Sequence, residues 1–261
     1  MKFRHKKSLG QHFLKDANIV RKIAKIAEIF PNEKVWEIGP GSGVLTEELL
    51  KHDCDLTCFE IDKNLYPLLE DKFGDKINLV KQDILKVDWQ KYFSDEKIKI
   101  VANLPYQITS PFLFTTAKYT KNFSKIVVMV QKEVAERISA KVGTKSYGKL
   151  TLKMQFYFDV EYGFTIKPNA FYPPPKIDSS IIILTPRKEM PKLQNEEKFW
   201  QIVEVAFKNR RKMLRRNFRE IFTKEEIEKL SEKFDLTRRG ETFTEMEFIE
   251  LYEDIYKVAK K

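Results

Sequence analysis

Four consecutive residues, Asn103-Leu104-Pro105-Tyr106, carry the groups needed to hold a planar amine for alkylation. An aromatic exocyclic amine such as adenine N6 is a poor nucleophile, because its lone pair is delocalised into the ring. The side-chain oxygen of Asn103 and the main-chain oxygen of Leu104 can accept its two N–H protons and turn the lone pair outward. Pro105 keeps Leu104 out of the helical region, and Tyr106 offers a ring on which a base can stack. Such a site acts through position and electrostatics and needs no strong general base.

A glycine-rich turn over residues 39–43 is the second feature with chemical meaning. The apolar run 35–38 precedes it and a helical pattern over 45–50 follows, which predicts strand, turn and helix in that order. Glycines let the backbone approach a ligand closely, and the amino end of a helix adds amide donors. A dinucleotide-binding motif needs a glycine where Val44 stands, so the spacing disfavours an NAD-dependent oxidoreductase.

Two acids follow the next predicted strands. Glu60 lies at the end of strand 55–61, near the offset at which an acid reaches ribose hydroxyls, and Asp83 follows strand 77–80. Ligand groups gather at the carboxyl ends of parallel strands. We therefore expect Glu60 to bind a ribose, and Asp83 to accept a hydrogen bond from an adenine amino group.

The elements that position these residues alternate between strand and helix, which is typical of a doubly wound α/β sheet. The predicted strands are residues 35–38, 55–61, 77–80, 98–102, 126–130, 151–158 and 179–184. A helix is expected from the N-cap Asp16 to Phe30, with others over residues 45–50 and 65–73. Beyond residue 186 the patterns are helical only: 196–207, 208–222, 224–234 and 245–259. We predict an α/β domain over residues 1–186 and a small all-helical domain over residues 187–261.

Positive charge is concentrated in two stretches of a chain whose net charge is +10. The first 25 residues contain basic side chains and a single acid, Asp16. A second stretch, residues 208–219, contains basic residues and no acid: Lys208, Arg210, Arg211, Lys212, Arg215, Arg216 and Arg219. A solvated helix face usually mixes both signs, so we predict that residues 208–219 contact an RNA backbone, with the cluster at residues 2–7 as a second arm.

The composition describes a soluble globular protein, with 42% hydrophobic and 33% charged residues. Cys54 and Cys58 are expected on one face of a strand as reduced core residues, and the three histidines show no metal-ligand spacing. No apolar stretch approaches membrane-spanning length, and the N-terminus lacks the apolar segment of a signal peptide. We expect a cytoplasmic protein without metal, and nothing in the sequence requires more than a monomer.

Glu37 and the three glycines form an E-x-G-x-G-x-G pattern that resembles the first motif of Rossmann-like class I methyltransferases, which use S-adenosylmethionine (SAM). More motifs together resemble the KsgA family of rRNA adenine N6,N6-dimethyltransferases over nearly the whole chain. They are Gln11-His12-Phe13-Leu14, Asn103–Tyr106, Gln131-Lys132-Glu133-Val134, Tyr147-Gly148, FYPPPKIDS at 171–179 and AFKNRRKMLRR at 206–216.

The resemblance implies an enzyme that transfers two methyl groups to each of two adjacent adenosines near the 3′ end of small-subunit (16S) rRNA during ribosome assembly. It implies SAM contacts at His12, Leu14, Glu37, Gly39, Gly41, Glu60, Asp83 and Asn103. A base inside a helix or hairpin must be extruded to reach such a site. Phe171 and Tyr172, stiffened by the three prolines that follow, suit a second stacking wall opposite Tyr106.

Two alternatives stay open. The related family that methylates large-subunit (23S) rRNA and confers macrolide resistance shares the Gln-x-Phe-Leu, glycine and Asn-x-Pro-Tyr motifs, but residues 171–179 and 206–216 favour the small-subunit enzymes. A non-catalytic ribosome assembly factor on a methyltransferase scaffold is a different class of protein. Loss of the glycine turn or of Asn103 would indicate it, and both are intact.

Overall fold

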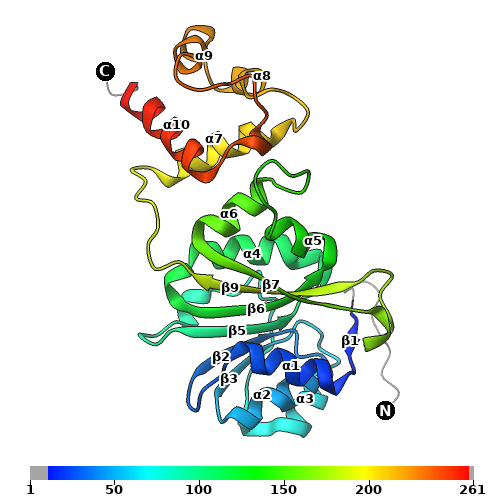
Figure 1. Ribbon diagram of the computed structural model, residues 1–261. Coiled ribbons are helices and arrows are strands. Elements are labelled where there is room, and N and C mark those ends of the chain that lie inside the picture. The colour runs from blue at the N-terminus through cyan, green and yellow to red at the C-terminus, as the bar shows by residue number, and fades with distance from the viewer. Residues whose placement is uncertain (1–10, 259–261) are drawn as a thin grey trace. The chain divides into compact units, whose positions relative to one another are not determined.

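The computed structural model describes residues 11–258, and the chain divides into two compact units (Figure 1). The first unit is Met1–Glu136 with Tyr157–Arg187, and the second is Arg137–Phe156 with Lys188–Lys261. The chain passes from the first unit to the second for the last time between Arg187 and Lys188, next to the boundary predicted after residue 186. Residues 137–156, which the sequence assigned to the α/β domain, belong instead to the second unit, because Tyr147 and Phe156 contact its aromatic side chains Phe207 and Phe199.

A seven-stranded sheet forms the centre of the first unit. Its strands are β2 (Lys34–Ile38), β3 (Asp55–Phe59), β4 (Asn78–Val80), β5 (Ile98–Asn103), β6 (Phe123–Gln131), β7 (Phe158–Ile166) and β9 (Ser179–Pro186). Their order across the sheet is β4-β3-β2-β5-β6-β9-β7. The first five run parallel, and β9 and β7 are antiparallel to their neighbours. The order reverses between β2 and β5, where open α/β sheets bind ligands at the carboxyl ends of the strands.

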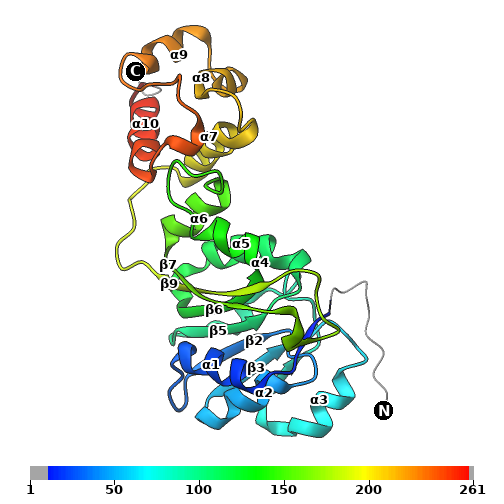
Figure 2. The same cartoon turned by 45° about the vertical axis from the view of Figure 1, so that its right-hand side comes forward.

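Helices cover both faces of this sheet, as Figure 2 shows. One face packs α1 (Ala17–Ala27), α2 (Val44–Leu49) and α3 (Tyr66–Phe73) on a cluster that includes Val35, Cys58 and Val101. Because successive strand residues point to opposite faces, Trp36 lies on the other side, with α4 (Thr109–Lys118) and an aromatic cluster. Both faces are buried, which explains the nearly continuous apolar runs of β5 and β6.

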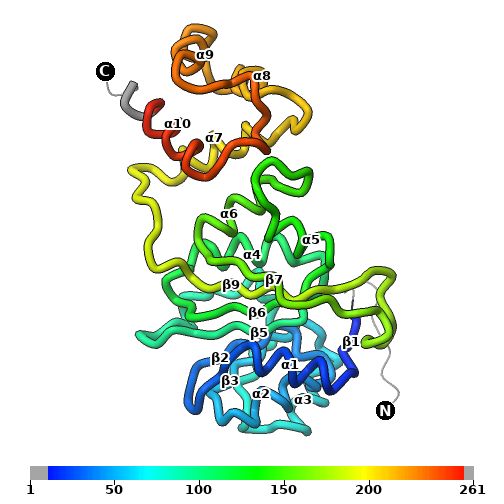
Figure 3. The backbone as a smooth tube through the Cα atoms, in the orientation of Figure 1, coloured from blue at the N-terminus to red at the C-terminus, as the bar shows by residue number. Residues whose placement is uncertain are grey.

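Strand β1 (Phe13–Leu14) forms a separate two-stranded sheet with β8 (Phe171–Tyr172). The pairing is antiparallel, with Phe13 opposite Tyr172 and Leu14 opposite Phe171. Figure 3 traces β1 beside the segment that joins β7 to β9. This small sheet holds Phe13 and Leu14 beside the carboxyl ends of the parallel strands in the main sheet.

Two predicted elements of the first unit need correction. The N-cap Asp16 is confirmed, since its carboxylate accepts the N–H groups of Asn18 and Ile19. However, α1 ends at Ala27 and not at Phe30, because Glu28 adopts a left-handed conformation (φ 51°) and its carbonyl oxygen binds the Lys99 ammonium. Phe30 is consequently 63% exposed.

The predicted strand over residues 151–158 is wrong. These residues belong mainly to α6 (Lys149–Tyr157), and the strand β7 begins only at Phe158. The alternation of Leu152, Met154 and Phe156 with polar residues imitates a strand. The polar Thr151 is nevertheless fully buried, and the bond from its hydroxyl group to the Arg137 carbonyl oxygen (2.6 Å) offsets the cost of burying it.

The second unit is helical. Beside α6 and the end of α5 (Lys132–Ile138) it contains α7 (Glu196–Lys208), α8 (Leu214–Asn217), α9 (Lys224–Ser231) and α10 (Glu245–Val258). Phe199, Phe218, Phe243 and Phe248 are buried in its core. The predicted end of the last helix, residue 259, and the basic cluster at residues 2–7 lie outside the described residues. No helix between residues 11 and 258 is long and apolar enough to span a membrane.

Candidate active site

A cavity opens where the parallel strands β2, β3, β4 and β5 end. Hydrogen bonds continue the sheet one residue further: Gly39 N–H donates to Phe59 O (2.9 Å) and Glu60 N–H to Val80 O (3.1 Å). Every predicted cofactor-binding residue lines this cavity, namely His12, Leu14, Glu37, Gly39, Gly41, Glu60, Asp83 and Asn103. Leu104 and Tyr106 line it as well. The fold therefore brings together residues that lie on five separate segments of the chain.

The glycine turn requires its glycines for two reasons. Gly39, Gly41 and Gly43 all have positive φ (71°, 60° and 78°), a conformation that costs other residues free energy. A Cβ atom on Gly41 would also lie 2.7 Å from the ring of Phe13, so the turn and β1 are in close contact. The turn can therefore present bare backbone to the cavity only while these positions have no side chain.

Glu37 is buried beneath the turn and is 1% exposed. Its Oε2 accepts hydrogen bonds from Thr46 Oγ1–H (2.6 Å) on α2 and from Cys58 S–H (3.6 Å) on β3. Burial raises the pKa of Glu37 to about 7, although the hydrogen bond from Thr46 opposes the shift. Burial also raises the pKa of the Cys58 thiol well above its ordinary value. Glu37 thus joins three elements around the turn.

Glu60 also holds the glycine turn, from the end of β3. Its Oε2 accepts the Gly41 N–H (3.2 Å) and its Oε1 accepts the Asp62 N–H (2.7 Å). Burial raises the pKa of Glu60, while these backbone donors favour its ionised form. The Asp83 Oδ1 accepts the Leu85 N–H (3.0 Å), so this acid is also oriented by its own loop.

Asn103, Leu104 and Tyr106 are each oriented by a different contact. Asn103 Nδ2–H donates to the His12 carbonyl oxygen (3.0 Å), so the amide oxygen must point away from that bond. Leu104 N–H donates to Met129 O (3.3 Å). The hydroxyl groups of Tyr106 and Ser179 are hydrogen-bonded (2.8 Å), and burial raises the pKa of the Tyr106 phenol. The ring of Tyr106 therefore has a fixed place at the cavity.

Residues 11–14 close one side of the cavity. His12 Nδ1–H donates to Pro173 O (2.8 Å), and its ring centroid lies 5.8 Å from that of Tyr106. Gln11 Nε2–H donates to Asp62 Oδ2 (2.9 Å). A segment distant in sequence from the strand ends thereby becomes part of their site.

The predicted stacking wall at Phe171 and Tyr172 is not present in this structure. Phe171 is 2% exposed, belongs to the core cluster with Leu14 and does not line the cavity. Tyr172 is 60% exposed. The cause is the pairing of β8 with β1, which turns alternate side chains to opposite sides.

Several residues line the cavity without having been predicted as site residues: Ile38, Ser42, Ile61, Gln82, Ile84 and Gln107. Two of them, Ile61 and Ile84, directly follow the acids Glu60 and Asp83 near the strand ends. Ile61, next to Glu60, is 46% exposed despite its apolar side chain. An apolar residue directly after an acid at a strand end is the signal that could have identified it.

The sequence predicts one helix over residues 208–222, but the structure breaks this basic stretch into shorter elements. Helix α7 ends at Lys208, residues 209–213 form turns, and α8 begins at Leu214. Asn217 explains this break: its buried Nδ2–H group donates to the carbonyl oxygens of Ala206 (2.9 Å) and Asn209 (3.3 Å). The carbonyl groups at the end of α7 are thereby satisfied without a further turn of helix.

The cations of this stretch have unequal surroundings. Arg210 Nη2 donates to the carbonyl oxygens of Lys145 (2.6 Å) and Tyr147 (2.7 Å) and pairs with Glu241 (3.1 Å). Lys208 pairs with Glu220 (2.6 Å). By contrast, some basic side chains are exposed and form no ion pair with any residue in 11–258: Arg211, Lys212, Arg215, Arg216 and Arg219.

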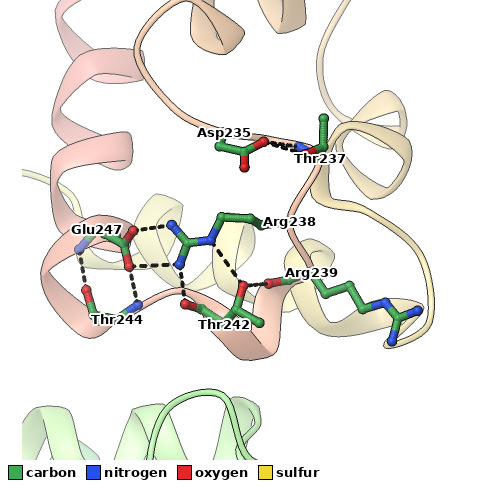
Figure 4. Close-up of polar contacts among 7 residues, drawn as sticks. All are labelled: Asp235, Thr237, Arg238, Arg239, Thr242, Thr244 and Glu247. Carbon is green, nitrogen blue, oxygen red and sulfur yellow. Dashed lines mark hydrogen bonds and ion pairs between the residues drawn. The ribbon is translucent and has the colours of Figure 1, made fainter.

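The loop at residues 235–239 supports α8, and its two arginines also have unequal surroundings (Figure 4). The loop is joined to α8 by hydrogen bonds from Leu214 N–H to Arg238 O (2.9 Å) and from Arg215 N–H to Leu236 O (3.0 Å). The Arg238 guanidinium is bound to Glu247, whose pKa it lowers. The next side chain, Arg239, extends away from this network in Figure 4.

No group of three or more His, Cys, Asp or Glu side chains among residues 11–258 is placed to hold a metal ion. Cys54 immediately precedes β3 and Cys58 lies within it, and both are free thiols.

The strand order, the glycine turn and the acids at the strand ends define a Rossmann-like class I methyltransferase fold. The sequence model of the family described as ribosomal RNA adenine dimethylase matches residues 2–258, and the chain belongs to this family. It is 40% identical over 267 residues to ribosomal RNA small subunit methyltransferase A of Staphylococcus haemolyticus, covering 97% of this chain and 90% of that one. The Levilactobacillus brevis protein of the same name is 42% identical over 261 residues, with 94% and 88% covered.

Solved structures agree with this assignment. A dimethyladenosine transferase from Plasmodium falciparum superimposes with a TM-score of 0.82 at 26% identity, covering 94% of this chain and 98% of that one. The 23S rRNA methyltransferase ErmE superimposes with a TM-score of 0.69, also at 26% identity, covering 92% and 98%.

Proposed function

We propose that this protein uses SAM to dimethylate the N6 amines of two adjacent adenosines near the 3′ end of small-subunit (16S) rRNA during ribosome assembly. One observation carries the proposal: the glycine turn and Asn103 line one cavity, with the Asn103 amide nitrogen bound to the His12 carbonyl oxygen. Membership of the adenine dimethylase family supports the reaction, and the names of the relatives support the small subunit.

The residues around the cavity suit SAM. The turn at Gly39 and Gly41 leaves room for the amino-acid part of the molecule, Glu60 can accept ribose hydroxyl groups, and Asp83 can accept the adenine amino group. His12, Leu14 and Glu37 complete the predicted cofactor contacts. When bound, SAM supplies an electrophilic methyl group on a positively charged sulfur. A carboxylate-rich cavity favours such a cation.

The target amine is activated by position. The Asn103 amide nitrogen is already engaged, so its oxygen is the atom that can accept one N6–H, and the Leu104 carbonyl can accept the other. With both protons held, the nitrogen lone pair turns out of the ring plane toward the methyl carbon. Transfer would form the new N–C bond as the S–C bond of SAM breaks, and the N6 proton would then leave to solvent, so the role of Asn103 and Leu104 is to position the amine.

Tyr106 provides the stacking surface for the extruded base. Its hydroxyl bond to Ser179 and its contact with the His12 ring fix the orientation of the phenol before RNA arrives. Phe171 is buried here, so in this proposal a second wall requires the β1–β8 pair to move when the base enters. Extrusion costs a few kcal/mol, which contacts to the RNA backbone must offset.

The second unit supplies part of those contacts in this proposal. Its candidate RNA-binding residues are the exposed Arg211, Lys212, Arg215 and Arg216. Arg210, predicted with them, is better described as a residue that supports the loop, because its guanidinium is held by two carbonyl oxygens and Glu241. We propose that the protein acts as a monomer in the cytoplasm, where its substrate assembles.

The test is methyl transfer from labelled SAM to separated, undermethylated small and large ribosomal subunits, followed by nucleoside analysis. Asn103→Ala removes the acceptor, and transfer should fall by roughly 10²–10³-fold, as when one preorganised group is lost from other active sites. Asn122→Ala, in a turn at the opposite edge of the sheet, is the matched control and should retain activity.

Dimethyladenosine from the small subunit alone, lost in Asn103→Ala, would support the proposal. Label in the large subunit would move the protein to the macrolide-resistance type. Tight binding of the small subunit without any label would instead identify a non-catalytic assembly factor.

A further inference from the structure

Helix α1 of the first unit has one buried face and one cationic face. Its buried residues, Val20, Ile23, Ala24 and Ala27, follow the spacing of a single helix face. The same spacing, displaced by two residues, gives the exposed face: Asn18, Arg21, Lys22 and Lys25. Two residues correspond to about 200° of rotation, so the two faces are opposite. Lys15, just before the helix, is also exposed.

The acids near this face are occupied by other contacts. Asp16 caps the helix, Glu28 is paired with Lys125, and Glu33 is paired with Lys99. Lys15, Arg21, Lys22 and Lys25 form no ion pair with any residue between 11 and 258. A solvated helix usually carries both signs, so this uncompensated charge needs an explanation.

Other contacts give this face a defined position. Arg21 Nη2–H donates to Asn18 Oδ1 (2.6 Å), and Lys22 Nζ lies 3.8 Å from the ring centroid of Phe164. Lys15 N–H donates to Ala170 O (2.9 Å), which attaches the start of the helix to the segment before β8. The cations are therefore fixed relative to β1, whose residues line the cavity.

The helix leads away from the cavity across the sheet. It follows β1 directly, and its far end meets Lys99 and Lys125 near the beginnings of β5 and β6 (Figure 2). From residue 18 to residue 25 it rises about 10 Å, close to three steps of a nucleic-acid strand at about 3.4 Å each.

We propose that the exposed face of α1, formed by Lys15, Arg21, Lys22 and Lys25, binds the phosphodiester backbone of the substrate RNA beside the extruded adenosine. The proposal rests on the proposed function and gives the catalytic unit an RNA surface of its own. Phosphates bound here hold the strand next to the cavity while the base is extruded. A membrane surface fits less well, because α1 exposes no large apolar side chain.

The test compares two triple variants with the same change in charge. Arg21→Gln/Lys22→Gln/Lys25→Gln neutralises the proposed surface. The control, Lys91→Gln/Lys118→Gln/Lys121→Gln, neutralises exposed lysines on and beside α4, on the other side of the sheet. Affinity for undermethylated small subunits is measured against salt concentration, together with SAM affinity as a check of folding.

Each lost phosphate contact lowers the salt slope, log K against log salt, by about 0.7–0.9. We expect the α1 variant to lose about 2–3 from the slope, because three contacts are removed. It should also need more subunit for half-maximal rate, with unchanged SAM affinity and unchanged rate at saturation. The control variant should keep the wild-type slope. An Arg21→Lys single variant should also keep it, because the charge is retained.

Equal slopes for the two triple variants would overturn the α1 proposal. A wild-type protein that neither binds nor methylates the small subunit would instead overturn the proposed function, so the two failures are distinguishable. If the α1 variant loses affinity for anionic vesicles but not for the subunit, the partner of this face is a membrane and the proposal is wrong.

Discussion

The cavity of the first unit is built mainly from backbone turns, whereas the basic stretch of the second unit is shaped by side-chain pairs. At the cavity, Gly41 N–H is held by Glu60, and Asn103 by the His12 carbonyl oxygen. At residues 208–219, the nearest acid or carbonyl decides which cation is free: Arg210 is bound to Glu241, and Arg211 has no partner within residues 11–258. A short sequence motif predicts the cavity better than the basic stretch. The reason is that strand and turn geometry fixes where the atoms of the motif lie, whereas the contacts of an exposed cation depend on its neighbours.

The cavity region should respond to pH through the buried Glu37. Burial raises the pKa of Glu37 from 4.5 to about 7, so the folded protein holds this proton more tightly than the unfolded chain. Raising the pH through that window removes the proton, and the free energy of unfolding falls with it. A shift of this size corresponds to about 3 kcal/mol.

Glu37→Gln should therefore remove a fall in stability of about 3 kcal/mol between pH 4.5 and pH 7. Glutamine keeps an oxygen that can accept the Thr46 hydroxyl but has no proton to lose. The measurement is urea unfolding at several pH values in a Trp200→Phe background. Trp36 and Trp89 then report the first unit alone.

Wild type and Glu37→Gln should differ most above pH 7 and least below pH 4.5. The comparison between variants isolates Glu37 from other groups that titrate in the same range. Parallel stability curves would show that the carboxyl group stays ionised in the folded protein. Burial of Glu37 would then not be the cause of any pH dependence.

Gly41→Ala tests the contact between the turn and β1. The new Cβ would lie 2.7 Å from the Phe13 ring, which must move and disturb the segment that closes the cavity. Overpacking of this kind costs about 1–3 kcal/mol, so we expect roughly a 10- to 100-fold loss of SAM affinity, measured by calorimetry.

Gly74→Ala is the matched control for Gly41→Ala. Gly74 also has a positive φ (49°), but a Cβ there would meet nothing within 4 Å. Both variants should lose stability from the strained backbone, Gly74→Ala by about 1–3 kcal/mol because its ψ of −128° lies outside the left-handed helical region. Only Gly41→Ala should lose affinity. Equal affinities would mean that Phe13 does not transmit the change to the cavity.

These differences explain how much could be predicted from sequence. Apolar runs bounded by turns predicted the parallel strands, and the ends of those strands then brought Glu60, Asp83 and Asn103 together. The prediction failed at residues 151–158, where alternation also fits a buried helix. It failed again at Phe171, because the pairing of β8 with β1 joins residues more than 150 positions apart. Local patterns contain no information about such a partner.

The basic stretch allows the sharpest single comparison, between adjacent arginines. Arg210→Ala removes hydrogen bonds to the carbonyl oxygens of Lys145 and Tyr147 and the pair with Glu241. Because this guanidinium is partly exposed, we expect a loss of about 1–2 kcal/mol in the second unit and no change in the salt slope of RNA binding. Arg211→Ala should leave stability unchanged and lower the slope by about 0.7–0.9.

Amide hydrogen exchange distinguishes these outcomes, because it reports protection of residues 143–150 separately from RNA affinity. Arg210→Ala should speed exchange there, whereas Arg211→Ala should not. If Arg210→Ala instead leaves exchange unchanged and flattens the slope as much as Arg211→Ala, both arginines contact RNA and the contacts of Arg210 with Glu241 and the two carbonyl oxygens yield to phosphate. The sequence alone would then have identified the cations that contact RNA, and the basic stretch would no longer differ from the cavity in this respect.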